Sequence, residues 1–128
     1  LQTEKNRKLH LVGHSTGAIL HGYLLQALQQ RLPDFRVSSV HLLAPAATVK
    51  LYTELYRPLL KPGPFGIDRL YIYCLTDELE LNDSVGPYRK SLLYFVSRSF
   101  EEKLPAKILG MEKYLKKIKS KPRNLKLI

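Results

Sequence analysis

Cysteine is almost absent from this chain, which contains Cys74 and no second thiol. A single cysteine excludes an internal disulfide, and because Cys74 lies in an apolar run we expect it to be a small core residue. No apolar run reaches the roughly 20 residues that a membrane-spanning helix needs. Internal repeats and low-complexity segments are also missing. The 128 residues, 45% of them hydrophobic, therefore suit one soluble domain with a packed core.

Acidic residues are scarce beside basic ones, with 11 Asp and Glu against 21 Lys and Arg. The imbalance is greatest between Lys103 and Lys126, where nine basic residues accompany a single acid, Glu112. Such a run suits either a surface that binds nucleic acid or an anionic membrane, or the solvated outer side of a helix. We expect the solvated helix, and therefore no specific binding of nucleic acid.

A strand, a turn and a helix follow one another near the start of the chain. The segment 9–12 is a short apolar run, broken only by His10, that is typical of a buried parallel strand. The five residues 13–17, GHSTG, follow directly, and a long helical pattern begins at Ala18. This order predicts a very tight turn that directs the hydroxyl of Ser15 away from the end of the sheet.

Two glycines frame this turn. Gly13 and Gly17 lie where we expect a Cβ atom to collide with the adjacent strand or helix, and His14 and Thr16 complete the motif. At these residues the chain resembles the α/β-hydrolase superfamily, and in particular its esterases and lipases, whose nucleophile turn reads Gly-x-Ser-x-Gly. The resemblance implies that Ser15 is the catalytic nucleophile and that the backbone N–H of Thr16 is one oxyanion donor.

The rest of the chain alternates between strand and helix patterns, the order that builds a parallel sheet covered by helices. The expected elements are helices over 18–32, 46–57, 87–103 and 111–119, and strands over 37–44, 69–76 and 124–128. Helix 18–32 is apolar on most faces, so we expect deep packing, and Pro33 should end it. The sequence therefore predicts an α/β fold, with a three-layer α/β/α arrangement around a mainly parallel sheet.

We expect residues 1–128 to form a single partial α/β-hydrolase domain. Its parts are the elbow strand and helix (8–32), the middle strand and helix (37–60), the strand and acid-bearing loop (69–88), and the C-terminal helices and final strand (89–128). Complete cores of this superfamily are considerably longer, and both ends of the sequence look cut. The resemblance therefore implies an internal piece of a longer protein.

The acid of a hydrolase triad follows the nucleophile along the chain, and two candidates lie beyond the strand at 69–76. The segment 82–88, NDSVGPY, resembles the Gly-Asp-Gly-x-Val-Pro-Tyr segment that carries the acid in several lipases, which favours Asp83. Asp77 follows the strand more closely, as in smaller esterases, and is the second candidate. Both acids come after all four histidines of the chain, His10, His14, His21 and His41.

The resemblance therefore implies that the catalytic histidine and the second oxyanion donor lie outside this sequence, and that these 128 residues alone are inactive. We expect His21 and His41 to be ordinary packed side chains. In the intact protein, the resemblance implies a serine hydrolase of carboxylic esters that works through an acyl-enzyme on Ser15. Its substrate would be a small-molecule ester or acyl compound, and it would need neither a metal nor an organic cofactor.

The alternative is a non-catalytic, hydrolase-like binding or scaffold protein that keeps the sheet and holds an anionic partner on its basic C-terminal surface. The helix expected at 111–119 has apolar residues on one side and lysines on the other. That pattern suits the surface helix of a globular protein, and it is also typical of a helix that lies on a membrane surface.

Overall fold

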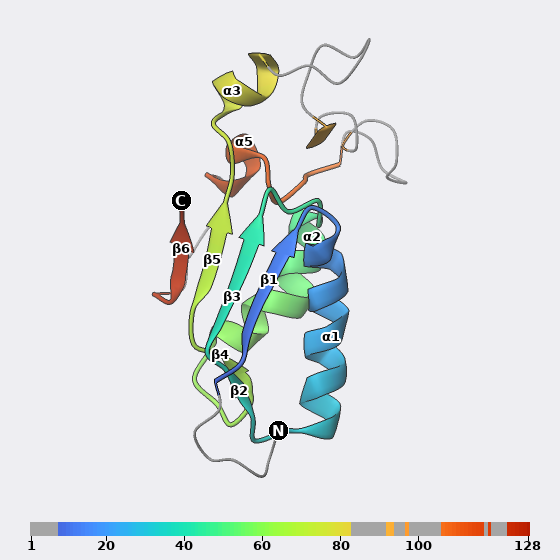
Figure 1. Ribbon diagram of the computed structural model, residues 1–128, viewed down its shortest axis with the longest axis vertical. Coiled ribbons are helices and arrows are strands. Elements are labelled where there is room, and N and C mark those ends of the chain that lie inside the picture. The colour runs from blue at the N-terminus through green and yellow to red at the C-terminus, as the bar shows by residue number, and fades with distance from the viewer. Residues whose placement is uncertain (1–7, 83–91, 94–96, 98–105, 117, 119–122) are drawn as a thin grey trace.

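The computed structural model describes residues 8–82, 92–93, 97, 106–116, 118 and 123–128. Its central feature is a four-stranded sheet with the order β1-β3-β5-β6, in which every neighbouring pair is parallel (Figure 1). The strands are β1 (His10–His14), β3 (Ser39–Leu43), β5 (Leu70–Tyr73) and β6 (Leu125–Leu127). The predicted α/β fold with a mainly parallel sheet is therefore confirmed.

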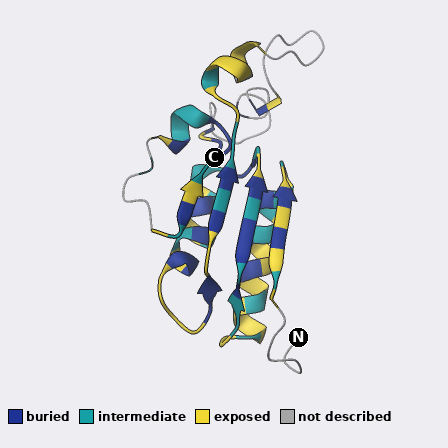
Figure 2. Ribbon diagram, turned by 60° about the vertical axis from the view of Figure 1, so that its left-hand side comes forward, coloured by how far each residue is buried: buried dark blue, intermediate teal, exposed yellow. Residues whose placement is uncertain are grey.

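Helices cover one face of this sheet (Figures 1 and 2). The helix α1 (Gly17–Arg31) packs along β1, and a second helical segment packs against α1. That segment begins as α2 (Val49–Leu51), continues as a π-helical turn, η1 (Tyr52–Tyr56), and ends as a 3-10 turn, η2 (Arg57–Leu60). The helix predicted over 46–57 is thus found, but it starts and ends later than expected.

The two faces of the sheet differ in exposure because side chains alternate along each strand. The face under the helices carries rows of buried apolar residues that are neighbours across the four strands, such as Leu11, Val40, Leu70 and Leu125. The matching row on the opposite face is Val12, His41, Tyr71 and Lys126. Val12 is 64% exposed. The described helices that cover the sheet, α1 and the segment 49–60, lie on one face, so a three-layer arrangement is not confirmed.

The helix α1 is buried along one stripe only. Its buried residues recur at helical spacing and are Ala18, Gly22 and Leu25. Leu20 and Tyr23 are 67% and 56% exposed. The expectation of deep packing on most faces is therefore wrong for the described structure, because α1 lies along the edge strand and only its inner side meets other elements. It ends at Arg31, two residues before Pro33, as predicted.

The strand predicted over 37–44 is divided in two. Arg36–Val37 forms β2, which pairs in parallel with β4 (Gly66–Ile67) in a small second sheet. Between β2 and β3, the N–H of Ser38 donates to the carbonyl of Leu9 at 2.9 Å. This bond ties the start of β3 to the start of β1, so the chain changes from one sheet to the other within a single residue.

Beyond β5 the chain forms a helix, α3 (Asp77–Asn82), where the sequence analysis expects a loop. The hydroxyl of Thr76 accepts a hydrogen bond from the N–H of Leu79 at 3.3 Å, the bond that a helix N-cap makes. Thr76 at that position was the available signal for this helix. Cys74, between β5 and α3, is partly buried against the core, as expected.

The C-terminal elements agree with the predicted positions where the structure describes them. The helix α5 (Glu112–Leu115) lies inside the range 111–119, and β6 lies inside 124–128. Most of the helix predicted over 87–103 lies outside the described residues. Within the described part of the chain, no helix is both long and apolar enough to cross a membrane.

Candidate active site

Ser15 lies on the turn between β1 and α1, at the carboxyl edge of the sheet (Figure 1). Its φ angle is 51°, in the left-handed region that residues other than glycine rarely adopt. Such a conformation costs about 1–3 kcal/mol and persists only where the surrounding structure holds it. The tight and strained turn expected at this serine is therefore present.

Three backbone hydrogen bonds hold Ser15 in this conformation. Its N–H donates to the carbonyl of Leu43, at the end of β3, at 3.0 Å. Its own carbonyl accepts from the N–H groups of Ala18 at 3.2 Å and Ala46 at 3.0 Å. Ala44 also has a positive φ, 41°, so a second left-handed turn follows β3 and brings Ala46 to the serine. The turn after β3 thus supports the turn after β1.

The start of α1 is suited to a negative charge beside Ser15. Thr16 is exposed and is the N-cap of this 15-residue helix, and its backbone N–H donates to no described residue. Unpaired N–H groups at a helix start, together with the positive end of the helix dipole, favour an anion there. The arrangement can therefore stabilise a negatively charged group beside Ser15.

The two glycines of the motif differ in their surroundings. A Cβ atom on Gly13 would lie 2.7 Å from Cδ2 of His21 and 3.0 Å from the carbonyl carbon of Gly17. A Cβ atom on Gly17 would meet no described atom within 4 Å. The collision expected at both positions is therefore found at Gly13, and the expectation is wrong at Gly17, because the first residue of α1 points away from β1.

The histidines at 21 and 41 are packed side chains, as predicted, and neither forms a hydrogen bond with Ser15. In His21, Nε2–H donates to the carbonyl of Val12 at 3.0 Å, and the buried Nδ1 has no partner among the described residues. His41 stands on the opposite face of the sheet from α1. Its ring nitrogens lie 3.0 and 3.1 Å from the hydroxyls of Ser39 and Tyr73.

Asp77 lies just beyond the carboxyl end of β5, at the same edge of the sheet as Ser15. Its N–H donates to Oε2 of Glu112 at 3.0 Å, and its Oδ1 accepts from the N–H of Lys113 at 3.3 Å. The side chain of Lys116, whose Nζ lies 2.7 Å from Oε1 of Glu112, and the N–H of Asp77 lower the pKa of Glu112. Asp77 therefore joins α3 to α5.

Asp83, the favoured acid, lies outside the described residues, together with nearly all of the segment 82–88 that carries its resemblance. The choice between Asp83 and Asp77 therefore stays a prediction. What the structure adds is that Asp77 already has partners on α5. A triad acid needs a free carboxylate oxygen to accept the Nδ1–H of the histidine.

A segment that borders the site was not predicted from the sequence. The N–H groups of Leu109 and Gly110 donate to the carbonyls of Ala47 at 2.7 Å and Pro45 at 2.9 Å. A Cβ atom on Gly110 would lie 2.7 Å from that same Pro45 oxygen. The turn that supports Ser15 is thus braced by residues far along the chain. The small side chains on both sides, APAA at 44–47 and Gly110, were the available signal for this close approach.

Among the described residues, no group of three or more His, Cys, Asp or Glu side chains is placed to hold a metal ion. No protein family, curated protein or solved structure matches the chain. The argument for function therefore rests on the geometry around Ser15.

Proposed function

We propose that this chain is the nucleophile-bearing part of a serine hydrolase that cleaves carboxylic esters. The observation that carries the proposal is the conformation of Ser15, a non-glycine residue at a φ of 51° between a parallel strand and a 15-residue helix. Strain of this kind collects at functional sites, because the surrounding bonds must hold it in place. The carboxyl edge of a parallel sheet is also where open α/β folds bind their ligands.

The chemistry would proceed in two steps. The oxygen of Ser15 bonds to the ester carbonyl carbon while a base takes its proton, and the alcohol leaves with that proton. Water then attacks the acyl carbon while the base takes its proton, the bond to the serine oxygen breaks, and the base returns the proton to Ser15 as the carboxylic acid leaves. During each attack the N–H of Thr16 donates to the developing oxyanion, and the start of α1 favours its charge. No metal or organic cofactor takes part in this scheme.

The base and the acid complete the proposal. No histidine follows Asp77 or Asp83 in the 128 residues, so the base would come from outside them. Asp83 is the proposed acid that orients this base. The contact of Asp77 with Lys113 supports that choice, because Oδ1 of Asp77 already accepts a hydrogen bond from the N–H of Lys113 at the junction of α3 and α5.

The three-layer arrangement belongs to the same proposal. All-parallel sheets are normally covered on both faces. Here Val12, Leu43 and Ile128 share the face without described helices, and they are 64%, 39% and 61% exposed. A second layer of helices over this face would bury these side chains and complete a hydrolase-like core.

Labelling by a fluorophosphonate tests the proposal directly, because such probes react with activated serines. We expect the full-length protein to be labelled and Ser15→Ala to abolish labelling, with a loss of roughly 10³-fold or more in the rate of ester hydrolysis. The matched control is Ser38→Ala, which removes a hydroxyl of the same chain in the connection to β3. That variant should be labelled as fast as the wild type.

Two results would reject the proposal. Equal labelling of the wild type and Ser15→Ala would remove this serine from the mechanism. A folded full-length protein that is not labelled and cleaves no ester would favour the alternative, a hydrolase-like binding or scaffold protein.

A further inference from the structure

A cavity of about 650 Å³ opens at the amino-terminal end of the sheet. It lies between Arg36 in β2, the segment 60–63 at the end of η2 and in the loop after it, and the pair Arg123 and Asn124 just before β6. Because Ser15 follows the carboxyl end of β1, the cavity lies at the opposite edge of the sheet (Figure 1). It does not belong to the proposed catalytic site.

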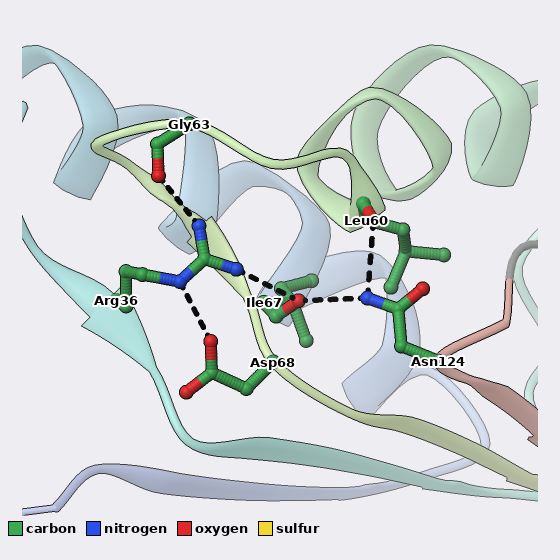
Figure 3. Close-up of polar contacts among 6 residues, drawn as sticks. All are labelled: Arg36, Leu60, Gly63, Ile67, Asp68 and Asn124. Atoms are coloured by element: carbon green, nitrogen blue, oxygen red, sulfur yellow. Dashed lines mark hydrogen bonds and ion pairs between the residues drawn. The ribbon is translucent and has the colours of Figure 1, made fainter.

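The walls of this cavity are fixed by hydrogen bonds (Figure 3). The guanidinium of Arg36 donates through Nε to Oδ1 of Asp68 at 2.6 Å and through Nη1 to the carbonyl of Gly63 at 2.7 Å. The side-chain amide of Asn124 donates to two carbonyls at 3.1 Å each, those of Leu60 and Ile67. These bonds hold the loop from both sides, so the cavity exists before any ligand arrives.

Two positive charges at this cavity are uncompensated. Lys61 and Arg123 are exposed, and neither forms an ion pair with a described residue. The nearby carboxylate of Asp68 is bonded to Arg36 instead. The lining also includes the apolar residues Leu60 and Pro62. The cavity therefore combines apolar lining with two cations that have no ion-pair partner among the described residues.

We propose that this cavity binds a phosphomonoester that carries an apolar group. A phosphomonoester has a charge of about −1.5 to −2 at neutral pH, which matches Lys61 and Arg123 together, whereas one carboxylate would match only one of them. The arginine offers a planar fork of donors to phosphate oxygens, and the lysine offers a point charge. The apolar part of the ligand would cover Leu60 and Pro62. The volume falls within the roughly 300–1,000 Å³ of small-molecule sites.

Calorimetric titration of the full-length protein with phenyl phosphate tests this proposal. Inorganic phosphate and benzoate are titrated in parallel, because the first lacks the apolar group and the second lacks the double charge. We expect saturable binding of phenyl phosphate, and at least about ten-fold weaker binding of each comparison ligand. Binding of inorganic phosphate as tight as that of phenyl phosphate would assign the site to free phosphate and overturn the apolar part of the proposal.

Variants separate the site from the overall charge of the protein, which is +10. The double variant Lys61→Gln and Arg123→Gln should weaken phenyl phosphate binding at least about ten-fold, because each lost partner was a charged donor. The matched control, Arg31→Gln and Lys107→Gln, removes the same charge from exposed positions outside the cavity. This control should change the affinity for phenyl phosphate by less than about two-fold, because salt screens exposed charges that are distant from the ligand.

A third variant tests the shape of the cavity without changing any charge. Gly63 lines the cavity, and a Cβ atom there would have only the carbonyl oxygen of Phe65 as a neighbour, at 3.7 Å. Gly63→Leu should therefore fold normally, fill part of the cavity and weaken phenyl phosphate binding. Equal weakening by the control double variant would show binding to general positive charge. The proposed site would also be rejected if Gly63→Leu bound phenyl phosphate as tightly as the wild type, or if the wild type showed no saturable binding.

Discussion

Replacing Gly13 by alanine should destabilise the turn that carries Ser15. The new methyl group would lie 2.7 Å from Cδ2 of His21 and 3.0 Å from the carbonyl carbon of Gly17. The imidazole cannot swing away freely, because its Nε2–H is bonded to the carbonyl of Val12. The second neighbour, the carbonyl carbon of Gly17, belongs to the backbone and cannot move without moving the start of α1. Overpacking of this kind costs about 1–3 kcal/mol, and the entropy that alanine removes from the unfolded chain returns only about 0.4–1 kcal/mol.

Gly17→Ala is the matched control, because it makes the same chemical change four residues away. A methyl group at Gly17 would meet no described atom within 4 Å, and alanine favours a helix over glycine by up to about 1 kcal/mol. Urea unfolding of the full-length variants should therefore show a lower midpoint for Gly13→Ala and an equal or higher one for Gly17→Ala. Fluorophosphonate labelling should slow only in the first.

The role of His21 in this collision can be measured separately. The double variant Gly13→Ala with His21→Ala removes the nearest neighbour of the new methyl group. Its loss of free energy of unfolding should therefore be smaller than the sum of the losses in the two single variants. Wild-type stability of Gly13→Ala would refute the reasoning, because it would mean that β1 and α1 can move apart at no cost.

Two further comparisons use matched pairs of variants. Tyr56→Phe should lower the free energy of unfolding by about 1 kcal/mol, because the buried hydroxyl of Tyr56 donates to the carbonyl of Ala18. Tyr52→Phe should leave the stability unchanged or raise it, because the buried hydroxyl of Tyr52 has no partner among the described residues. Thermal or urea unfolding measures both. For the proposed hydrolase, Asp83→Asn in the full-length protein should lower turnover by about 10⁴-fold, as a wrong histidine tautomer would, and Asp77→Asn should lower it far less. The reverse ranking at equal stability would assign the acid to Asp77.

The parts of the fold that depend on neighbouring residues were predictable. The strand, turn and helix from β1 to α1 follow from a short apolar run, a Gly-x-Ser-x-Gly segment and a helical period that ends before Pro33. Parallel pairing followed from the alternation of strands and helices. At this turn the prediction that a Cβ atom would collide with its neighbours was right for Gly13 and wrong for Gly17. The direction of a Cβ atom at Gly17 depends on the exact start of the helix.

The parts that depend on distant residues were not predictable. The division of the strand at 37–44 follows from the bond between Ser38 and Leu9, which no local pattern reveals. The same holds for the junction of α3 with α5, where the N–H of Asp77 donates to Glu112. The exposed side of α1 was misjudged for a related reason. An apolar side chain such as Leu20 predicts burial, but not which element would provide it.

The strain at Ser15 is best understood as a property of the whole carboxyl edge of the sheet. Two strands in succession end in a left-handed residue, Ser15 after β1 and Ala44 after β3, at a cost of about 1–3 kcal/mol each. Against this cost stand backbone hydrogen bonds worth about 0.5–1.5 kcal/mol each. Ser15 donates to β3, Ala46 donates back to Ser15, Ala44 donates to Tyr73 at 2.8 Å in β5, and Gly110 donates to the turn at Pro45.

These bonds form a chain that leads from the elbow across β3 to β5 and to the segment before α5. Together the bonds are comparable in size to the combined strain. The backbone conformation of Ser15 therefore depends on residues as distant in sequence as Gly110. A Cβ atom on Gly110 would lie 2.7 Å from the carbonyl oxygen of Pro45, so a larger residue there would separate the two segments.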